Sequence, residues 1–192
     1  MTTIIESIRA EYLRYKALAE AAIEQSADTD LSAPGPGEGN SIGVICWHLS
    51  GNLQSRFTDF LSTDGEKPWR QREEEFRART VTRAELNAKW SQGWNALLDT
   101  LETLRDDQLS ATVTIRGQPL LVHEALLRSL AHLSYHVGQI VYIAKSLRGG
   151  EWKFLSIPPG QSDAYNRNPT MEKAAAHRDT ILNDSSGSSP GG

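Results

Sequence analysis

The chain lacks the features that mark several specialised classes of protein. Its single cysteine, Cys46, excludes an internal disulfide framework and favours a reducing, cytoplasmic location. No stretch approaches the roughly 18 consecutive apolar residues of a membrane span, and the N-terminal MTTIIESIRAEYLRYK carries charges where a signal peptide has an apolar segment. Basic runs are also missing and the net charge is −4, so nucleic-acid binding through clustered Lys and Arg is not expected.

What remains is a composition typical of a globular protein. Of the 192 residues, 23% are charged and 39% are apolar, which is enough for one domain with a substantial core. We assign this domain to residues 1–168. Residues 169–192 are mostly polar and end in SSGSSPGG, so a flexible C-terminal tail with a disordered end is expected there.

Four segments place apolar residues at three- and four-residue steps, the spacing of one face of an α-helix. Asn40 or Ser41 could cap the second helix, and Thr82 and Glu85 have the spacing of a capping box at the start of the third. We therefore predict an all-α protein, a four-helix bundle with long helices packed near-antiparallel and with loops over 28–41 and 64–81. The four predicted helices cover about residues 3–26, 41–63, 82–104 and 120–147.

Two further elements are predicted around the last helix. Val113 and Ile115 alternate with polar residues ahead of Arg116-Gly117, a pattern that indicates a small β-hairpin over 111–122. GEWKFLSIPPG (150–160) keeps several apolar side chains, and it is expected to pack on the bundle as an extended C-terminal arm.

Histidine carries the clearest chemical signal. His132 and His136 are four residues apart on the last helix, so their side chains stack on one face and can reach one ion. Leu133 stands where a zinc protease has its glutamate, so that class is not indicated. His48 lies at the edge of the second helix's apolar stripe and could face this pair. Three neutral imidazoles suit Zn, Ni, Co or Fe, with a position open for water or substrate; the alternative is that they are hydrogen-bonded structural side chains.

The other residues capable of chemistry have mainly structural interpretations. His123 faces the opposite side of the last helix from His132, and His177 is expected to be solvated in the polar tail. Cys46 lies within an apolar stripe and is expected to be buried. Arg56 and Asp59 share the His48 side of their helix, so they are candidates for contact with substrate or for catalysis. The neighbouring charges could hold an acidic or zwitterionic substrate near the metal, since Arg pairs carboxylates through two bonds. The favoured interpretation is a solvated loop with internal ion pairs, over Glu66, Lys67, Arg70 and Arg72.

Three stretches carry a family resemblance: NSIGVICWHLSGNLQSRFTDFLSTDGEKPWR, HLSYHVGQIVYIAKSL and WKFLSIPPGQS. Together they resemble one branch of the DinB-like, YfiT-like superfamily of metal-binding four-helix bundles, over about residues 5–166. The resemblance implies that His48, His132 and His136 bind a divalent metal. Characterised members of the superfamily include transferases and isomerases that use bacillithiol, mycothiol or glutathione, and proteins described as metal hydrolases. The resemblance implies no particular reaction for this branch.

The leading functional hypothesis is a metal-dependent enzyme. A metal on the three histidines would activate a thiol for transfer or, as the second choice, a water for hydrolysis. The alternative from another class is a non-catalytic bundle, with or without metal, that serves as a binding or stress-response module. The expected partner is a small-molecule substrate, for which a low-molecular-weight thiol is one candidate. Binding to nucleic acid or to a membrane is not expected. The five tryptophans provide apolar area for a homodimer interface.

Overall fold

The computed structural model of the protein describes residues 2–186, with side chains described as far as residue 184. Within this range it is mostly helical, with one two-stranded antiparallel hairpin. The four long helices are α1 (Ile4–Glu24), α2 (Ile42–Phe57), α4 (Arg83–Thr103) and α5 (Val122–Arg148). The short ones are α3 (Arg72–Glu75), α6 (Ser162–Asn166) and α7 (Ala174–Ser186), with 3₁₀ turns at Asp28–Leu31, Asp106–Gln108 and Gly149–Glu151.

The long helices begin where the sequence places capping residues. Ser41, one of the two predicted caps, accepts a hydrogen bond from the backbone N–H of Val44 at the start of α2. Thr82 and Glu85 form the predicted capping box of α4, in which each side chain satisfies the backbone N–H of the other residue. Such caps satisfy donors that have no partner inside the helix, so they fix the first turn in position.

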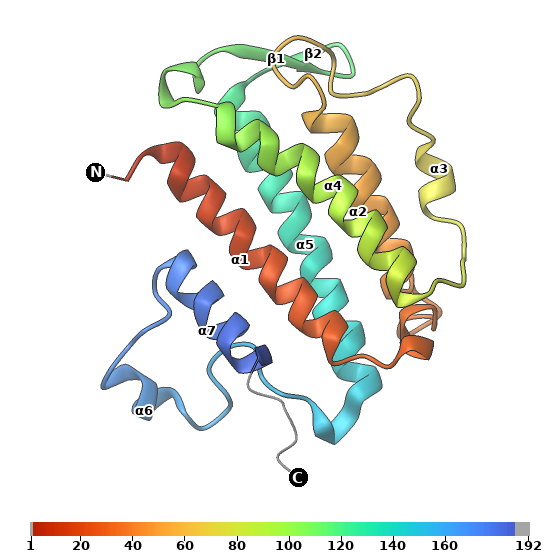
Figure 1. Ribbon diagram of the computed structural model, residues 1–192, viewed down its shortest axis with the longest axis vertical. Helices are drawn as coiled ribbons and strands as arrows, with labels where there is room; N and C mark the ends of the chain where they lie inside the picture. The colour runs from red at the N-terminus through yellow and green to blue at the C-terminus, as the bar shows by residue number, and fades with distance from the viewer. Residues whose placement is uncertain (1, 187–192) are drawn as a thin grey trace.

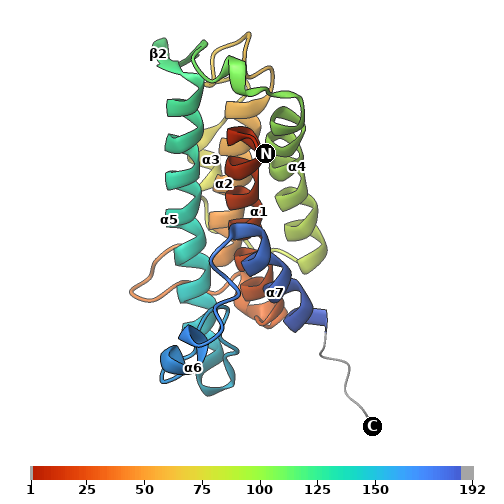
Figure 2. The same ribbon diagram turned by 90° about the vertical axis from the view of Figure 1, so that its left-hand side faces the viewer.

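The four long helices lie side by side around one core (Figures 1 and 2). Trp94 of α4 and Tyr12 of α1 are fully buried, and the Tyr12 hydroxyl donates to the Leu126 carbonyl of α5 over 2.9 Å. A buried hydroxyl needs such a partner, so this bond ties α1 to α5 at the centre of the core. None of the helices described combines the length and the apolar character that crossing a lipid bilayer requires.

The helix directions differ from the near-antiparallel expectation. α2 and α4 pack closely and point the same way, because residues 58–82 lead back along the outside of the molecule before α4 begins (Figure 1). α5 runs in the direction opposite to α2, so the end of α2 lies beside the beginning of α5 (Figure 1). This reversed alignment places the histidines of the two helices at the same level.

The predicted hairpin is present at the end of the molecule where α2 ends and α5 begins (Figure 1). β1 (Thr112–Ile115) pairs with β2 (Gln118–Leu121), and the turn residues Arg116 and Gly117 both have positive φ, 55° and 71°. The Asp64 carboxylate accepts hydrogen bonds from the backbone N–H groups of both turn residues. The hydrogen bond from the Glu66 backbone N–H lowers the pKa of Asp64 most, and with these two bonds it brings the pKa to about 2. The hairpin is thereby fixed to the loop that follows α2.

The C-terminal segment is more ordered than its composition predicts. α7 packs along α1, with Ile181 buried between them, in a segment expected to be a flexible tail. His177 was expected to be solvated, but it is buried and its Nε2 lies 2.8 Å from the Leu155 carbonyl of the preceding arm. The expected solvation of His177 is wrong, because apolar contacts dock α7 on α1 and bring the imidazole against the arm. The predicted disorder of SSGSSPGG falls mainly on residues 187–192, outside the described residues.

Candidate metal centre

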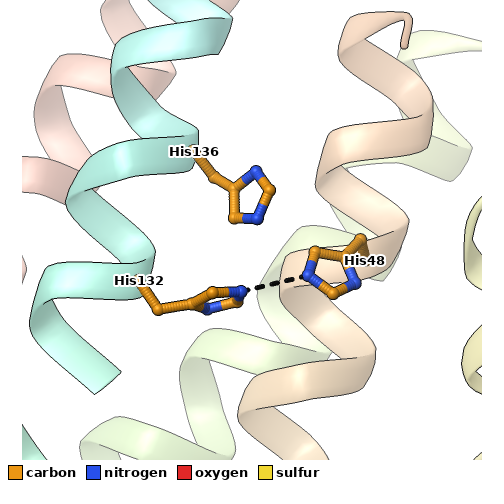
Figure 3. Close-up of side chains that lie close together, drawn as sticks. All are labelled: His48, His132 and His136. Carbon is orange, nitrogen blue, oxygen red and sulfur yellow. Dashed lines mark hydrogen bonds between the residues drawn. The ribbon is translucent and has the colours of Figure 1, made fainter. Parts of the chain in front are cut away.

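The three histidines singled out by the sequence lie together between α2 and α5 (Figure 3). His48 projects from α2 toward His132 and His136, which project from successive turns of α5. His48 Nε2 and His132 Nε2 are 3.1 Å apart, and the three possible ligand nitrogens all lie within 4.8 Å of one another. His48 and His136 are buried, whereas His132 is partly exposed. One small ion could therefore be reached by all three rings.

This donor set fits a divalent metal of the zinc type. Two nitrogens bound to one tetrahedral zinc ion are separated by about 3.4 Å, given Zn–N bonds of about 2.0–2.1 Å. The 3.1 Å between the His48 and His132 nitrogens is close to this value. The third ring would need a shift of about an ångström, which is within the reach of a side-chain rotation.

Hydrogen bonds on the far side of two rings orient them for metal binding. His48 Nδ1 lies 2.9 Å from a carboxylate oxygen of Glu75, and His136 Nδ1 lies 2.7 Å from the amide oxygen of Gln139. Both partners are acceptors, so each Nδ1 carries a proton and each Nε2 keeps its lone pair. Metal-binding histidines in proteins are held in this way, with the second nitrogen donating to an oxygen.

Asp59, a candidate from the His48 side of the second helix, is not one of these partners. Asp59 is exposed and has a φ of 50°, beyond the end of α2 at Phe57. Its predicted position assumed that the helix continued at 100° per residue. Since the helix ends two residues earlier, Asp59 lies beside a different hollow, between the end of α2 and α4.

Glu75 lies on the His48 side, where Asp59 was expected, and it comes from the loop predicted over 64–81. It lies in the short helix α3, and its side chain also forms a two-point ion pair with Arg70, with N–O distances of 2.8 and 2.9 Å. Only 2% of the Arg70 side chain and 9% of the Glu75 side chain are exposed. Burial opposes ionisation of Glu75, but the bonds from Arg70 and His48 outweigh it and lower its pKa. The pair is therefore ionised and rigid.

One feature of the sequence did indicate this contact. Gly51 lies within α2, where glycine is unfavourable by about 1 kcal/mol relative to alanine. A Cβ atom built on Gly51 would lie 2.2 Å from Oε1 of Glu75. The glycine thus provides the space in which the carboxylate approaches the helix and reaches His48.

Replacing Gly51 with alanine should therefore weaken metal binding although it favours the helix. We expect Gly51→Ala to displace Glu75 from His48 and to reduce zinc affinity by about tenfold, the low end of the effect of losing such a partner. Competition with a chromogenic chelator measures this affinity. Gly138→Ala is the matched control, because a Cβ on that glycine of α5 would contact nothing within 4 Å. Equal zinc affinity in the two variants would show that Glu75 does not depend on this space.

The protein environment also keeps two of the rings neutral. Burial lowers the pKa of His132 to about 3, and the neighbouring His136, His48, Arg70 and Arg56 contribute to the shift. Burial lowers the pKa of His136 as well, although the hydrogen bond that its Nδ1 donates to the Gln139 amide oxygen acts in the opposite direction. A histidine must be neutral to bind a metal, so both rings are in the binding form at neutral pH.

A cavity of about 470 Å³ opens directly beside the three histidines. Arg56, the other candidate from the sequence, lines it and forms an ion pair with Glu66 at 3.1 Å. The remaining lining residues come from α2, the 70–76 segment, the hairpin turn and α5: Asn52, Phe57, Phe60, Arg70, Arg72, Phe76, Ile115, Arg116, Ala125, Arg128 and Ser129. The ring of Phe76 packs on that of His48, with 4.5 Å between their centroids.

Other residues considered from the sequence lie apart from this site. Cys46 is fully buried, and its burial raises the pKa of the thiol, so it is neither ionised nor accessible. His123 Nδ1 lies 3.0 Å from the Leu109 carbonyl, as a structural histidine would.

A family model matches most of the chain. The model of a family described as "Protein of unknown function (DUF1572)" matches residues 1–161, a range that includes the three histidines, Glu75 and the cavity. No curated protein and no solved structure matches the chain.

Proposed function

The chain belongs to the DUF1572 family, and we propose that it is a metal-dependent enzyme that activates a small thiol. One observation carries the proposal: three histidines within 4.8 Å of one another border an open cavity of about 470 Å³. Metal sites with a purely structural role are closed by four protein ligands, whereas catalytic sites leave a position open to substrate. Three protein nitrogens beside a cavity are consistent with the second kind.

The resemblance to DinB-like bundles makes the proposal more specific. We infer that α1, α2, α4 and α5 form a four-helix bundle of that kind within a single domain over residues 1–168. Because characterised members use thiols, transfer of a thiol is our first choice and hydrolysis by water our second. The same resemblance and composition support a cytoplasmic protein. We also propose that two copies of the chain associate as a homodimer.

The residues around the histidines would have distinct roles. When bound, a divalent metal would lower the pKa of a thiol or water in its open position and present it as the anion. Glu75 and Gln139 orient His48 and His136 through their Nδ1 protons. Phe76 covers one face of His48 and excludes water from that side. Substrate would enter through the cavity, where His132 is the most exposed of the three rings.

Replacement of the metal by cobalt(II) tests the proposal directly. Adding 2-mercaptoethanol or glutathione to the cobalt protein should give a near-ultraviolet thiolate-to-cobalt absorption band, and one proton should be released per thiol bound. The band should persist in Cys46→Ala, which removes the protein's own thiol. If cobalt binds but no thiol produces the band, thiol activation is wrong. If no divalent ion binds, the metal-dependent function is wrong altogether.

A further inference from the structure

The cavity beside the histidines has an unusual charge. Five arginines line it and no aspartate or glutamate does, although the whole protein carries a net charge of −4. The arginines come from four separate parts of the chain: Arg56, Arg70 and Arg72, Arg116, and Arg128. Cations that converge in this way from α2, the 70–72 segment, the hairpin turn and α5 create a positive potential inside the hollow.

Three of these arginines share too few carboxylates to be neutralised. Glu66 lies 3.1 Å from Arg56, 3.0 Å from Arg116 and 3.7 Å from Arg70, so one carboxylate serves three guanidinium groups. Glu75 adds one negative charge, on the side of the histidines. Burial lowers the pKa of Arg56 and the ion pair with Glu66 raises it, while the nearby charges of Arg70 and Arg116 lower it again. The wall formed by these side chains therefore keeps a positive excess while its geometry is fixed.

Two further donors in the cavity wall, Arg128 and Asn52, have no side-chain partner among the described residues. In the part of the chain that the structure describes, Arg128 forms no ion pair or hydrogen bond and Asn52 forms no side-chain hydrogen bond. Both line the cavity. A guanidinium has five N–H donors and binds a carboxylate or phosphate through two of them at once, so Arg128 is suited to an oxyanion.

The helix geometry aligns these donors with the histidines. Arg128, His132 and His136 follow one another at four-residue steps on α5, and His48, Asn52 and Arg56 do the same on α2. Four residues advance a helix by about 6 Å. α2 ends and α5 begins at the hairpin (Figure 1), so Arg56 and Arg128 lie nearer the hairpin than the histidines of the same helices. The cavity thus has a cationic end and a metal-binding end.

Apolar side chains also line the cavity. Phe57 and Phe60 are buried in the core, and each contributes to the cavity wall together with Phe76 and Ile115. Ligand pockets of a few hundred cubic ångströms with apolar walls and a few fixed polar groups are typical of small-molecule sites.

We propose that this cavity binds a small molecule that has an apolar body and an oxyanion head, a carboxylate or a phosphate, held by Arg128 and Asn52 against the Arg56–Arg70–Arg116 wall. The inference rests on the proposed function, since it names the substrate class of the same site. The opposite end of such a molecule would lie at the histidines, where the reacting group belongs.

Calorimetric titration of the full-length protein with three probes of one shape tests the inference. Benzoate and phenyl phosphate carry the two oxyanions, and benzamide is the neutral counterpart of benzoate. We expect saturable binding of one or both anions, at least about tenfold tighter than benzamide and weakened by added salt. The tighter of the two anions identifies the head group. Equal affinity for benzoate and benzamide, with no binding of phenyl phosphate, would overturn the inference.

Two arginine variants assign the binding to the cavity. Arg128→Gln should weaken anion binding by about tenfold, the value of one charge-assisted pair. Arg167→Gln, at an exposed position that caps α6 at the other end of the molecule, should leave it unchanged. Equal effects of the two variants would mean non-specific attraction and would also overturn the inference.

Metal analysis of the same preparations separates this inference from the proposed function. The titrations are made on the metal-loaded protein and on protein treated with a chelator. Metal bound without anion binding ends the inference about the substrate and leaves the metal site. Anion binding in a protein that takes up no metal supports the cationic end and ends the metal-dependent function.

Discussion

Replacing His132 with alanine is expected to remove most of the bound divalent metal and to leave the helical fold intact. The free energy of binding at a tetrahedral zinc site, about 10–16 kcal/mol, is shared among four ligands, so one lost imidazole should reduce affinity by about a hundredfold or more. The fold does not depend on this residue, which is partly exposed and forms its one described hydrogen bond with His48. His48→Ala and His136→Ala should have the same effect on the metal.

Elemental analysis of protein purified without a nickel column, together with zinc titration and circular dichroism, measures this prediction. His123→Ala is the matched control, because that histidine lies on the same helix and outside the cluster. It should retain the wild-type metal content. Loss of the helical circular-dichroism signal in the His132 variant would make the site structural. Full metal retention in all three site variants would show that the ion is bound elsewhere.

Replacing Glu75 with alanine should have the largest effect on stability. Arg70 would remain buried, with only the more distant Glu66 at 3.7 Å as its carboxylate partner. Removing one member of a buried ion pair costs about 3–5 kcal/mol of the free energy of unfolding. His48 would also lose the acceptor that fixes its Nδ1 proton, and zinc affinity should fall by about 10–100-fold.

Urea unfolding and zinc competition test these two effects separately. Glu73→Ala is the matched control in the same short helix, because its side chain is 87% exposed and pairs only with Arg72 on the surface. Its effect on unfolding should stay below about 1 kcal/mol. Glu75→Gln, which keeps an acceptor for His48 but removes the charge, should fall between the two. Equal stability of the Glu73 and Glu75 alanine variants would refute the structural importance of the buried pair.

Local sequence patterns predicted most of the helical framework. They also indicated that the three histidines lie together. Caps at Ser41 and Thr82 and the turn at Arg116-Gly117 depend on neighbouring residues, so they could be recognised directly. The spacing of His132 and His136 follows from the pitch of one helix. The position of His48 at the edge of its apolar stripe made convergence with the other two a reasonable inference, although the distance between the helices was not available from the sequence.

The tertiary structure decided the features that depend on chain reversal and on where helices stop. α2 and α4 point the same way because residues 58–82 run back along the outside of the molecule, and the periodicity of the helices does not indicate that path. Asp59 was misplaced because α2 ends at Phe57, and α7 was missed because its docking on α1 rests on few apolar residues. Glu75 reaches His48 across 27 positions of sequence, through space left by Gly51. Periodicity reports which residues share a face, but only packing determines which faces meet.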